Sequence, residues 1–411
     1  MKKRFGKDKR NIAILFFTMV VMMVGFGIII PIMPFYVDYL GVGGKELGLL
    51  MAVFSIMQFI FAPLWGSLSD RFGRKPILIL GVFGNAISLV LMGFSTTYWM
   101  LLGSRALAGV LSSATLPTAM AYVADSTSTR DRGGGMGLIG AAMGIGMVLG
   151  PGLGGWAAGR SLSMPFFLAA ALSGVALLLL AVLLPESLPR EKRSQDVRLT
   201  GPRLQDMWQA LVGPLGILFF LAFLVSFAMT NFEAIFGLYA LHQFNFGPQQ
   251  VGTILTVIGL ISAIVQGALT GPATRKWGEI SVIRISLLSS AVGFVLMLLA
   301  VDFTTVLLTV GFFVLSNTML RPSLSSLISQ LAQEGQGLAM GLTNSFMSLG
   351  RVVGPVWAGF LFDANTHLPY LSGSAVMLIG FGLSLVYLSR QKHQVTLSAD
   401  LIEPVDHHHS P

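Results

Sequence analysis

The chain has 411 residues, of which 54% are hydrophobic and only 11% are charged. Soluble domains carry roughly 25% charged residues, so this sequence lacks the polar side chains that a soluble fold of its length needs at its surface. Its net charge of +8 does not indicate nucleic-acid binding, because the basic residues are dispersed between long apolar runs. The absence of cysteine excludes disulfides, thiol nucleophiles and Cys-ligated metals. The composition therefore indicates a polytopic membrane protein.

The apolar runs predict twelve membrane-spanning helices, since a helix needs about 20 mostly apolar residues to cross a bilayer. The predicted spans are 12–36, 47–68, 76–96, 98–123, 134–158, 164–184, 212–236, 250–271, 280–300, 303–328, 337–362 and 368–389. We thus expect an all-α polytopic membrane protein with two six-helix bundles, over residues 1–184 and 212–390. The Arg-, Glu- and Gln-rich stretch 185–211 is predicted to be a cytoplasmic linker, and 391–411 a disordered cytoplasmic tail.

The distribution of Lys and Arg predicts the orientation of the spans. Of the 26 basic residues, 21 fall in the segments on the side of the two termini, two (Lys45 and Arg160) on the other side, and three within spans. Both termini are therefore predicted to be cytoplasmic. A secretory signal is the alternative for the basic N-terminus, but the apolar run is too long and no small-x-small cleavage site follows it. The tail residues 407–409 are His; a metal site is conceivable there, but we expect a solvated end and no metal.

The two halves resemble each other at a nearly constant offset. Residues 66–75 are similar to 271–279 at an offset of 205, and Pro117 matches Pro322 at the same offset. Residues 150–155 match 354–359 at an offset of 204. Parallel repeats related by an axis along the membrane normal are typical of transporters that bind substrate between the two halves.

The motifs in these segments make the chain similar to the major facilitator superfamily. Residues 66–75 fit the superfamily's G-x-L-x-D-R-x-G-R-K loop, and 146–155 fit the G-x-x-x-G-P-x-x-G-G signature of drug:proton antiporters. Residues 101–109 match the superfamily's Arg-containing motif, although they lack its usual Gln before Gly109. Segments 27–36, 58–63, 232–239 and 321–323 resemble the twelve-span multidrug efflux pumps of Gram-positive bacteria.

This resemblance implies a proton-coupled exporter of lipophilic, often cationic compounds that works by alternating access. It implies a monomer in the bacterial plasma membrane, with protons and small molecules as partners and no cofactor. A lipid or glycolipid flippase, or an exporter of one metabolite, remains the alternative on the same fold. A membrane enzyme is disfavoured because no catalytic cluster lies at one depth, and a receptor does not require a duplicated gate.

The loop that follows the second span is the predicted cytoplasmic gate. Glycines allow close approach of helix ends, Asp70 can accept hydrogen bonds from a helix N-terminus, and Arg74 can pair with Asp125. The resemblance implies a latch that closes the cytoplasmic side; the alternative is a set of charges that only sets topology. The second repeat departs from the pattern, with Arg275 where the first has Asp70. The predicted gate residues are Gly66, Asp70, Arg71, Gly73, Arg74 and Asp125.

The fifth span is predicted to be a tightly packed helix without chemistry of its own. Glycines at small-xxx-small spacing allow close helix contact, and a proline removes one backbone hydrogen bond. The antiporter-motif residues are Gly146, Gly150, Pro151, Gly154 and Gly155.

Glu233 is the only acidic residue in the central part of any predicted span. A carboxylate there is costly unless it faces a cavity, pairs with a cation or is protonated, which suits exchange of a proton for a cation. A structural Glu that bonds a neighbouring helix is the alternative. The resemblance links Arg105 to proton coupling; backbone bonding is the alternative there. Thr318 stands where some relatives have an acid, and Arg351 has no predicted partner.

The substrate cavity is predicted from residues that share a face with Glu233 or lie in central spans. Met and Phe are abundant, with 21 and 29 copies, and they suit an adaptable pocket, although most must face lipid or pack helices. The cavity candidates are Asn231, Phe236, Gln58, Phe54, Asn344 and Phe346.

Overall fold

The protein is described by a computed structural model that covers residues 2–128, 131–194, 204–332 and 335–400, without the side chains of 2–9, 204 and 388–400. Twelve helical segments of the described chain are long and apolar enough to cross a membrane. They are α1 (Lys2–Tyr39), α2 (Gly44–Phe72), α3 (Arg74–Gly93), α4 with α5 (Tyr98–Ser112 and Thr115–Ser126), α6 (Arg132–Ala158), α7 (Met164–Leu183), α9 (Gly216–Phe244), α10 with α11 (Pro248–Ile264 and Thr270–Trp277), α12 (Glu279–Met297), α13 with α14 (Phe303–Thr318 and Leu320–Leu331), α15 (Gln336–Ala364) and α16 (Leu368–Asp400).

The twelve predicted spans are confirmed, although several boundaries differ, among them those of the seventh. We predicted its end at 236, but α9 continues to Phe244 and ends where Asn245 adopts a left-handed φ of 56°. The polar residues His242 and Gln243 belong to this last turn, so hydropathy alone ended the span too early. In the linker, a 3-10 turn (Arg190–Lys192) and helix α8 (Leu204–Val212) are formed.

The C-terminal end of the chain also differs from the expected boundary. The backbone of α16 is helical to Asp400, so ten residues of the segment expected to be disordered continue the last helix. Residues 401–411, which include the three tail histidines, lie outside the described residues.

Two spans are interrupted at equivalent places in the two repeats. The fourth span breaks at Ser113 and Ala114, and the tenth at Met319. In each case a proline follows within a few residues, Pro117 in α5 and Pro322 in α14. Because proline lacks an N–H and its ring crowds the carbonyl four residues earlier, the α-helical hydrogen-bond ladder is interrupted just before it. The repeat seen in the sequence is thus present as a repeat of helix breaks.

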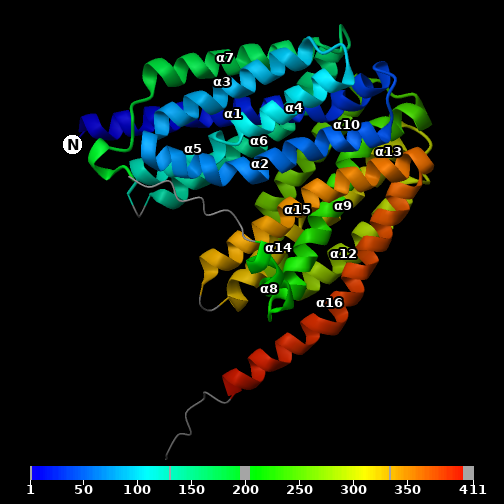
Figure 1. Ribbon diagram of the computed structural model, residues 1–411. Coiled ribbons are helices and arrows are strands. Elements are labelled where there is room, and N and C mark those ends of the chain that lie inside the picture. Colours follow the sequence, from blue (N-terminus) through cyan, green and yellow to red (C-terminus); the bar gives the residue numbers. More distant parts are fainter. Residues whose placement is uncertain (1, 129–130, 195–203, 333–334, 401–411) are drawn as a thin grey trace, which may run out of the picture.

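The helices form two bundles, α1–α7 and α9–α16, which meet at one end and diverge at the other (Figure 1). Within the bundles, α1 packs on α6 and α3 on α7, as α9 packs on α15 and α12 on α16. Between them, α2 packs against α15 and α6 against α10. We call the diverging end, where both termini lie, the terminal side. The joined end, formed by the ends of these four helices near Gly44, Ala158, Pro248 and Ala364, is the closed side.

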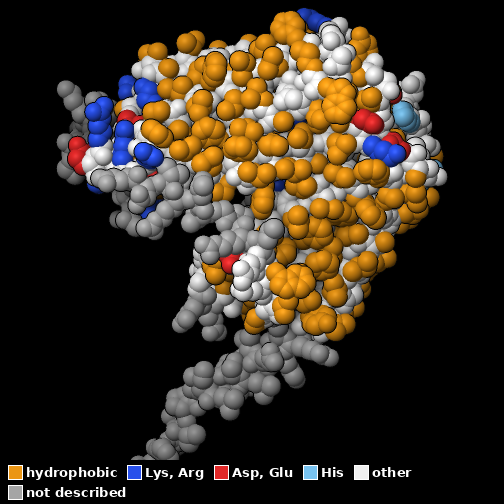
Figure 2. Space-filling view, in the orientation of Figure 1, with side chains coloured by type: hydrophobic (Ala, Val, Ile, Leu, Met, Phe, Trp, Pro, Cys, Tyr) orange, Lys and Arg blue, Asp and Glu red, His pale blue; other side chains and the backbone are white. Residues whose placement is uncertain are grey.

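The surface of the two bundles is largely apolar, as expected for helices in contact with lipid (Figure 2). Lys and Arg side chains gather at the terminal end of the α1–α7 bundle in that view. Exposed aromatic residues lie near span ends, with Trp99 and Trp156 toward the closed side and Trp277 toward the terminal side. Aromatic belts of this kind mark the two membrane–water interfaces.

Candidate transport site and gate

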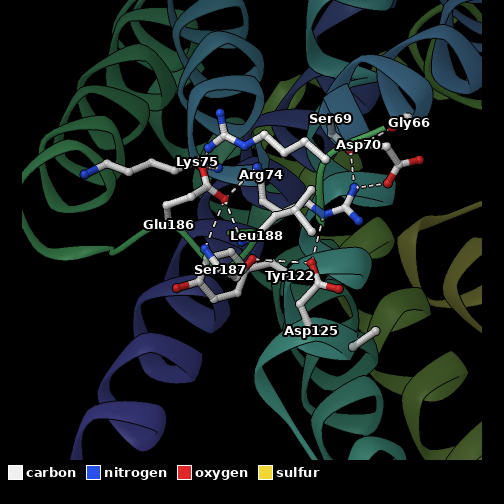
Figure 3. A network of polar contacts seen from close by, with 12 residues as sticks. Gly66, Ser69, Asp70, Arg74, Lys75, Tyr122, Asp125, Glu186, Ser187 and Leu188 are labelled. Atoms are coloured by element: carbon white, nitrogen blue, oxygen red, sulfur yellow. Dashed lines mark hydrogen bonds and ion pairs between the residues drawn. The ribbon is translucent and has the colours of Figure 1, made fainter. Parts of the chain in front are cut away.

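Four of the six predicted gate residues, Gly66, Asp70, Arg74 and Asp125, belong to one polar cluster at the terminal side of the α1–α7 bundle (Figure 3). Arg74 is at its centre: its Nη1 lies 2.6 Å from Asp70 Oδ1 and its Nε 2.9 Å from Asp125 Oδ2. Nη1 also donates to Ser69 Oγ at 2.7 Å, and the Ser69 hydroxyl donates to the Gly66 carbonyl at 2.8 Å. The Arg74 side chain is only 9% exposed, so these acceptors replace water around a nearly buried guanidinium.

The other two gate residues have different roles. Gly73 joins α2 to α3 with φ of 106°, a conformation that favours glycine, and a Cβ there would collide with the Glu186 carboxylate. Arg71 is exposed and its guanidinium lies over the Phe72 ring, 5.5 Å from the centroid. Among the described residues, the cluster joins α2, α3, α5 and the start of the linker, all within one half of the molecule.

Glu186, which was not among the predicted site residues, completes this cluster. Its carboxylate accepts from the first two amides of α3, Arg74 N–H at 2.8 Å and Lys75 N–H at 3.2 Å. It also accepts from the amides of Ser187 and Leu188, both at 3.0 Å. A carboxylate at a helix N-terminus satisfies free N–H groups and the helix dipole. Its signal in the sequence was weak, because it comes from the linker, 112 residues from Arg74.

The second repeat holds an analogous contact with the charge reversed. Glu279 occupies the place of Arg74 and Gln330 that of Asp125, each 205 residues later. Gln330 Nε2 donates to Glu279 Oε1 at 2.7 Å, and Ser326 Oγ donates to the same oxygen at 3.1 Å. The departure at Arg275 therefore belongs to a wider exchange of charges between the two repeats.

The glycines of the antiporter motif allow α6 to pack closely on two helices. On one face, a Cβ at Gly150 would lie 2.7 Å from Gly27 Cα in α1, and one at Gly154 would lie 3.0 Å from a carbonyl of α1. Gly146 packs on the same helix near Met23. On the other face, Gly155 meets α10 of the other bundle. Pro151 is buried within α6.

Glu233 lies on α9 at the place where this helix faces α15 and α1. One turn earlier, Thr230 Oγ1 donates to the Gly350 carbonyl of α15 at 3.1 Å, and one turn later Gly237 packs against Pro34 of α1. Glu233 is partly accessible, and among the described residues its carboxylate has no hydrogen bond or ion pair. Arg351 is the charged residue that lies within electrostatic range of it.

Arg351, for which the sequence predicted no partner, has polar and charged neighbours in the structure. Its Nη2 donates to Ser348 Oγ at 2.7 Å, and it lies within electrostatic range of Arg321 as well as Glu233. Arg321 is exposed although it belongs to a span, and an arginine in a span is expected to face protein or water rather than lipid. Thr318, where some relatives have an acid, is hydrogen-bonded to Ser262 at 3.2 Å.

Arg105 is not brought together with Glu233. It is 2% exposed and lies among residues of α2, with its guanidinium 4.7 Å from the Phe54 ring centroid. Its Nε donates to the Leu50 carbonyl at 3.4 Å and its Nη2 faces Met51 Sδ at 3.6 Å. Within the described part of the chain, Nη1 has no hydrogen-bond partner and no carboxylate pairs with this cation.

The six cavity candidates divide into two groups. Asn231, Phe236 and Phe346 are buried inside the α9–α16 bundle and do not line accessible space in this conformation: Asn231 donates to the Pro369 carbonyl at 2.9 Å, Phe236 packs on Phe232, and Phe346 stacks on Phe219. The helical face on which a residue lies did not show whether its side chain packs inside this bundle or lines the space between the bundles. Phe54 is 9% exposed beneath Arg105, whereas Gln58 is partly accessible and Asn344 is exposed.

Comparison with known proteins agrees with this architecture. The chain matches the Major Facilitator Superfamily over residues 15–221 and 218–405. It is 34% identical to Multidrug resistance protein 2 of Bacillus subtilis over 400 residues, which cover 97% of this chain and 100% of that protein. It is 29% identical to the Quinolone resistance protein NorA of Staphylococcus aureus, over 94% of this chain and 98% of that protein.

Solved structures have the same fold. The human organic anion transporter MFSD10 (TETRAN) superposes with a TM-score of 0.64 at 25% identity, covering 92% of this chain and 99% of that one. A bacterial homolog of the human lysosomal transporter Spinster superposes with a TM-score of 0.76 at 13% identity, covering 93% and 98%. The chain belongs to the Major Facilitator Superfamily and is a multi-pass protein of the plasma membrane.

Proposed function

We propose that the protein is a proton-coupled exporter of lipophilic drugs and toxic compounds, and that it acts as a monomer with both termini in the cytoplasm. Relatives over nearly the whole chain are a multidrug resistance protein and a quinolone resistance protein. The basic residues gathered at the terminal side support a cytoplasmic location for that side. The observation that carries proton coupling is Glu233, an intramembrane carboxylate that is partly accessible and has no described bonding partner.

The proposed cycle uses Glu233 as the group that is either protonated or bound to substrate. In its charged form it attracts a cationic compound that enters from the cytoplasm. A proton from outside neutralises it and removes that attraction, so the substrate leaves. Arg351 lies within electrostatic range and competes for the charged form, which keeps the carboxylate from binding substrate too tightly to release it. Because an ion in a low-dielectric site is costly without a partner, the empty and charged state is transient.

The experiment is efflux of a lipophilic cationic dye from proteoliposomes at two imposed pH gradients. We expect Glu233→Gln to reduce gradient-driven transport to the level of empty liposomes, while the variant expresses and inserts normally. Glu191→Gln, a change of the same type in the exposed linker, is the matched control and should transport normally. Normal gradient-driven efflux by the Glu233 variant would refute the proposed coupling.

Organic anions are a second candidate class of substrate, favoured by the charges within the spans. The spans contain three guanidinium groups, of Arg105, Arg321 and Arg351, against one centrally placed carboxylate, and none of the three forms an ion pair with a described residue. The structurally similar MFSD10 is named an organic anion transporter. Uptake of a lipophilic carboxylate and of a lipophilic cation, compared in wild type and Arg321→Gln, distinguishes the classes: anion transport should fall in the variant, and cation transport should not.

A further inference from the structure

A carboxylate at the end of α15 binds the first turn of α2 across the boundary between the two bundles. The Gly44 amide donates to Asp363 Oδ1 at 2.7 Å, and the Lys45 amide donates to Oδ2 at 3.1 Å. These residues are more than 300 positions apart and belong to different halves of the molecule. The first amides of a helix have no partner inside the helix, and the helix dipole favours a negative charge there. Asp363 therefore supplies, from the other bundle, the hydrogen-bond acceptors for these two amides of α2.

The start of α2 is shared between the two bundles. The Gly43 amide donates to Glu46 Oε2 at 3.0 Å, which is a cap from within the same helix. The next two amides are the ones that Asp363 accepts from. When the bundles separate on this side, the Gly44 and Lys45 amides lose the Asp363 carboxylate, and all three groups must form hydrogen bonds with water instead. The contact can therefore exist only while the closed side is closed.

Close packing below this contact fixes its geometry. A Cβ at Gly44 would lie 2.9 Å from both Asp363 Oδ1 and the Gly359 carbonyl, so only glycine leaves room for the approach. One turn further into the membrane, Gly48 lies directly against the Pro355 carbonyl of α15. The backbones of α2 and α15 thus meet without intervening side chains, and the Asp363 carboxylate lies at one end of this contact.

Asp70, the acidic residue near the other end of α2, differs from Asp363 because its ion pair lies within its own bundle. Asp70 is bound to Arg74 of its own bundle, and its side chain is 53% exposed. No described residue of the other bundle bonds to it. In this conformation the carboxylate at the closed side is therefore engaged across the two bundles, and the carboxylate at the terminal side is not.

We propose that Asp363 is a positioning residue of the transport cycle: its contact with the N-terminus of α2 holds the side opposite the termini closed, and its release is a step of opening toward that side. The proposal rests on alternating access in the proposed exporter. It does not depend on the substrate or on proton coupling, so it can fail while the exporter function stands, and the reverse.

The test measures the distance between the bundles at each side by electron spin resonance. The chain has no cysteine, so pairs of introduced cysteines are the only sites that take spin labels. The closed-side pair is Trp99→Cys with Leu371→Cys, whose native side chains are 76% and 47% exposed. The terminal-side pair is Leu138→Cys with Lys276→Cys, exposed residues of α6 and α11. Measurements in nanodiscs without substrate or gradient report only the conformational equilibrium.

We expect Asp363→Asn to raise the ratio of outward-open to inward-open molecules roughly twofold to fivefold, the range for an exposed charge at a helix N-terminus. The closed-side distance should lengthen and the terminal-side distance should shorten together, which loss of structure would not produce. Asp302→Asn is the matched control. Asp302 also caps a helix at the closed side, accepting from the Thr305 amide at 2.8 Å, but within one bundle, so the control should leave both distances unchanged.

A second variant tests the same contact by a different route. Gly44→Ala retains the carboxylate but places a methyl group where Asp363 and Gly359 approach, and it should shift both distances in the same direction as Asp363→Asn. Unchanged distances in Asp363→Asn would overturn the proposal, as would an equal shift in Asp302→Asn. If Asp363→Asn does not yield folded protein, unchanged distances in Gly44→Ala overturn it instead.

Discussion

Arg74 and Glu279 occupy equivalent places in the two halves of the molecule, 205 residues apart, and carry opposite charges. Arg74 pairs with Asp125 at 2.9 Å, whereas Glu279 accepts from Gln330 at 2.7 Å. Both contacts join the start of the third helix of a repeat to the end of the fourth. The repeat has kept the contact and exchanged its chemistry, so the two halves carry polar clusters of different charge at equivalent places.

The Arg74 cluster predicts a large effect of removing its central cation. Arg74→Ala should lower the free energy of unfolding by roughly 1–3 kcal/mol, because Asp70 and Asp125 lose their partner but remain partly solvated. Thermal unfolding in detergent measures this. Arg71→Ala removes an exposed neighbour whose guanidinium lies over the adjacent Phe72 ring, and it should change stability little. Equal losses in the two variants would contradict the central role of Arg74.

The Glu186 contact predicts that the linker stabilises α3. Glu186→Gln should cost about 1–2 kcal/mol, because the charged acceptor at the helix N-terminus becomes neutral. Hydrogen exchange at the Arg74 and Lys75 amides should accelerate in this variant. Glu191→Gln, in the exposed turn that follows, is the control and should leave exchange at these amides as in the wild type. Unchanged exchange in Glu186→Gln would show that the cap is not needed.

The packing of α6 predicts that two of its glycines respond oppositely to the same change. Gly150→Ala places a Cβ 2.7 Å from Gly27 Cα, so α1 and α6 must separate, and we expect a loss of about 1–3 kcal/mol together with lower transport. Gly144→Ala, on the same helix, has nothing within 4 Å of the added Cβ. It should leave stability unchanged or raise it by up to about 1 kcal/mol through helix propensity. Similar losses in both would rule out the packing argument.

The Glu279–Gln330 contact of the second repeat predicts a variant whose stability depends on pH. Gln330→Glu replaces the amide that donates to Glu279 by a second carboxylate, so two like charges face each other at neutral pH. We expect a loss of about 1 kcal/mol relative to wild type, small because Gln330 is exposed. The loss should shrink as the pH falls, because protonation of one carboxyl removes the repulsion and restores a donor. Thermal unfolding at several pH values measures it, with Gln243→Glu as control; a loss that grows toward acid would be inconsistent.

We expect the start of α13 to fray in acid, because the Asp302 carboxylate caps it. Its carboxylate accepts from the amide and the hydroxyl of Thr305, and these hydrogen bonds hold the pKa of Asp302 below its ordinary value. A lowered pKa means that the stabilisation is present above the ordinary carboxyl pKa and is lost as the pH falls through the lowered one. Protection of the Thr305 amide from hydrogen exchange should therefore decrease toward acid. In Asp302→Asn this pH dependence should be absent; its persistence there would assign it to another group.

The membrane class, the twelve helices and the repeat could all be predicted from the order of the residues. Hydrophobic length, proline and glycine act locally along the chain, so they can be read from it: Pro117 and Pro322 interrupt their helices where the sequence places them. It also predicted the Arg74–Asp125 pair, because the two residues lie at the ends of adjacent spans on one side.

Contacts between side chains that are far apart in the sequence could not be predicted and are seen only in the folded molecule. Glu186 reaches α3 from the linker, Asp363 reaches α2 from the other bundle, and Arg351 rather than Arg105 lies near Glu233. The sequence could not assign Asn231 to the interior of its bundle, because helical periodicity gives a face but not the neighbour of that face. Partners of this kind depend on how the helices are rotated and packed, and packing is a property of the whole assembly rather than of any one segment.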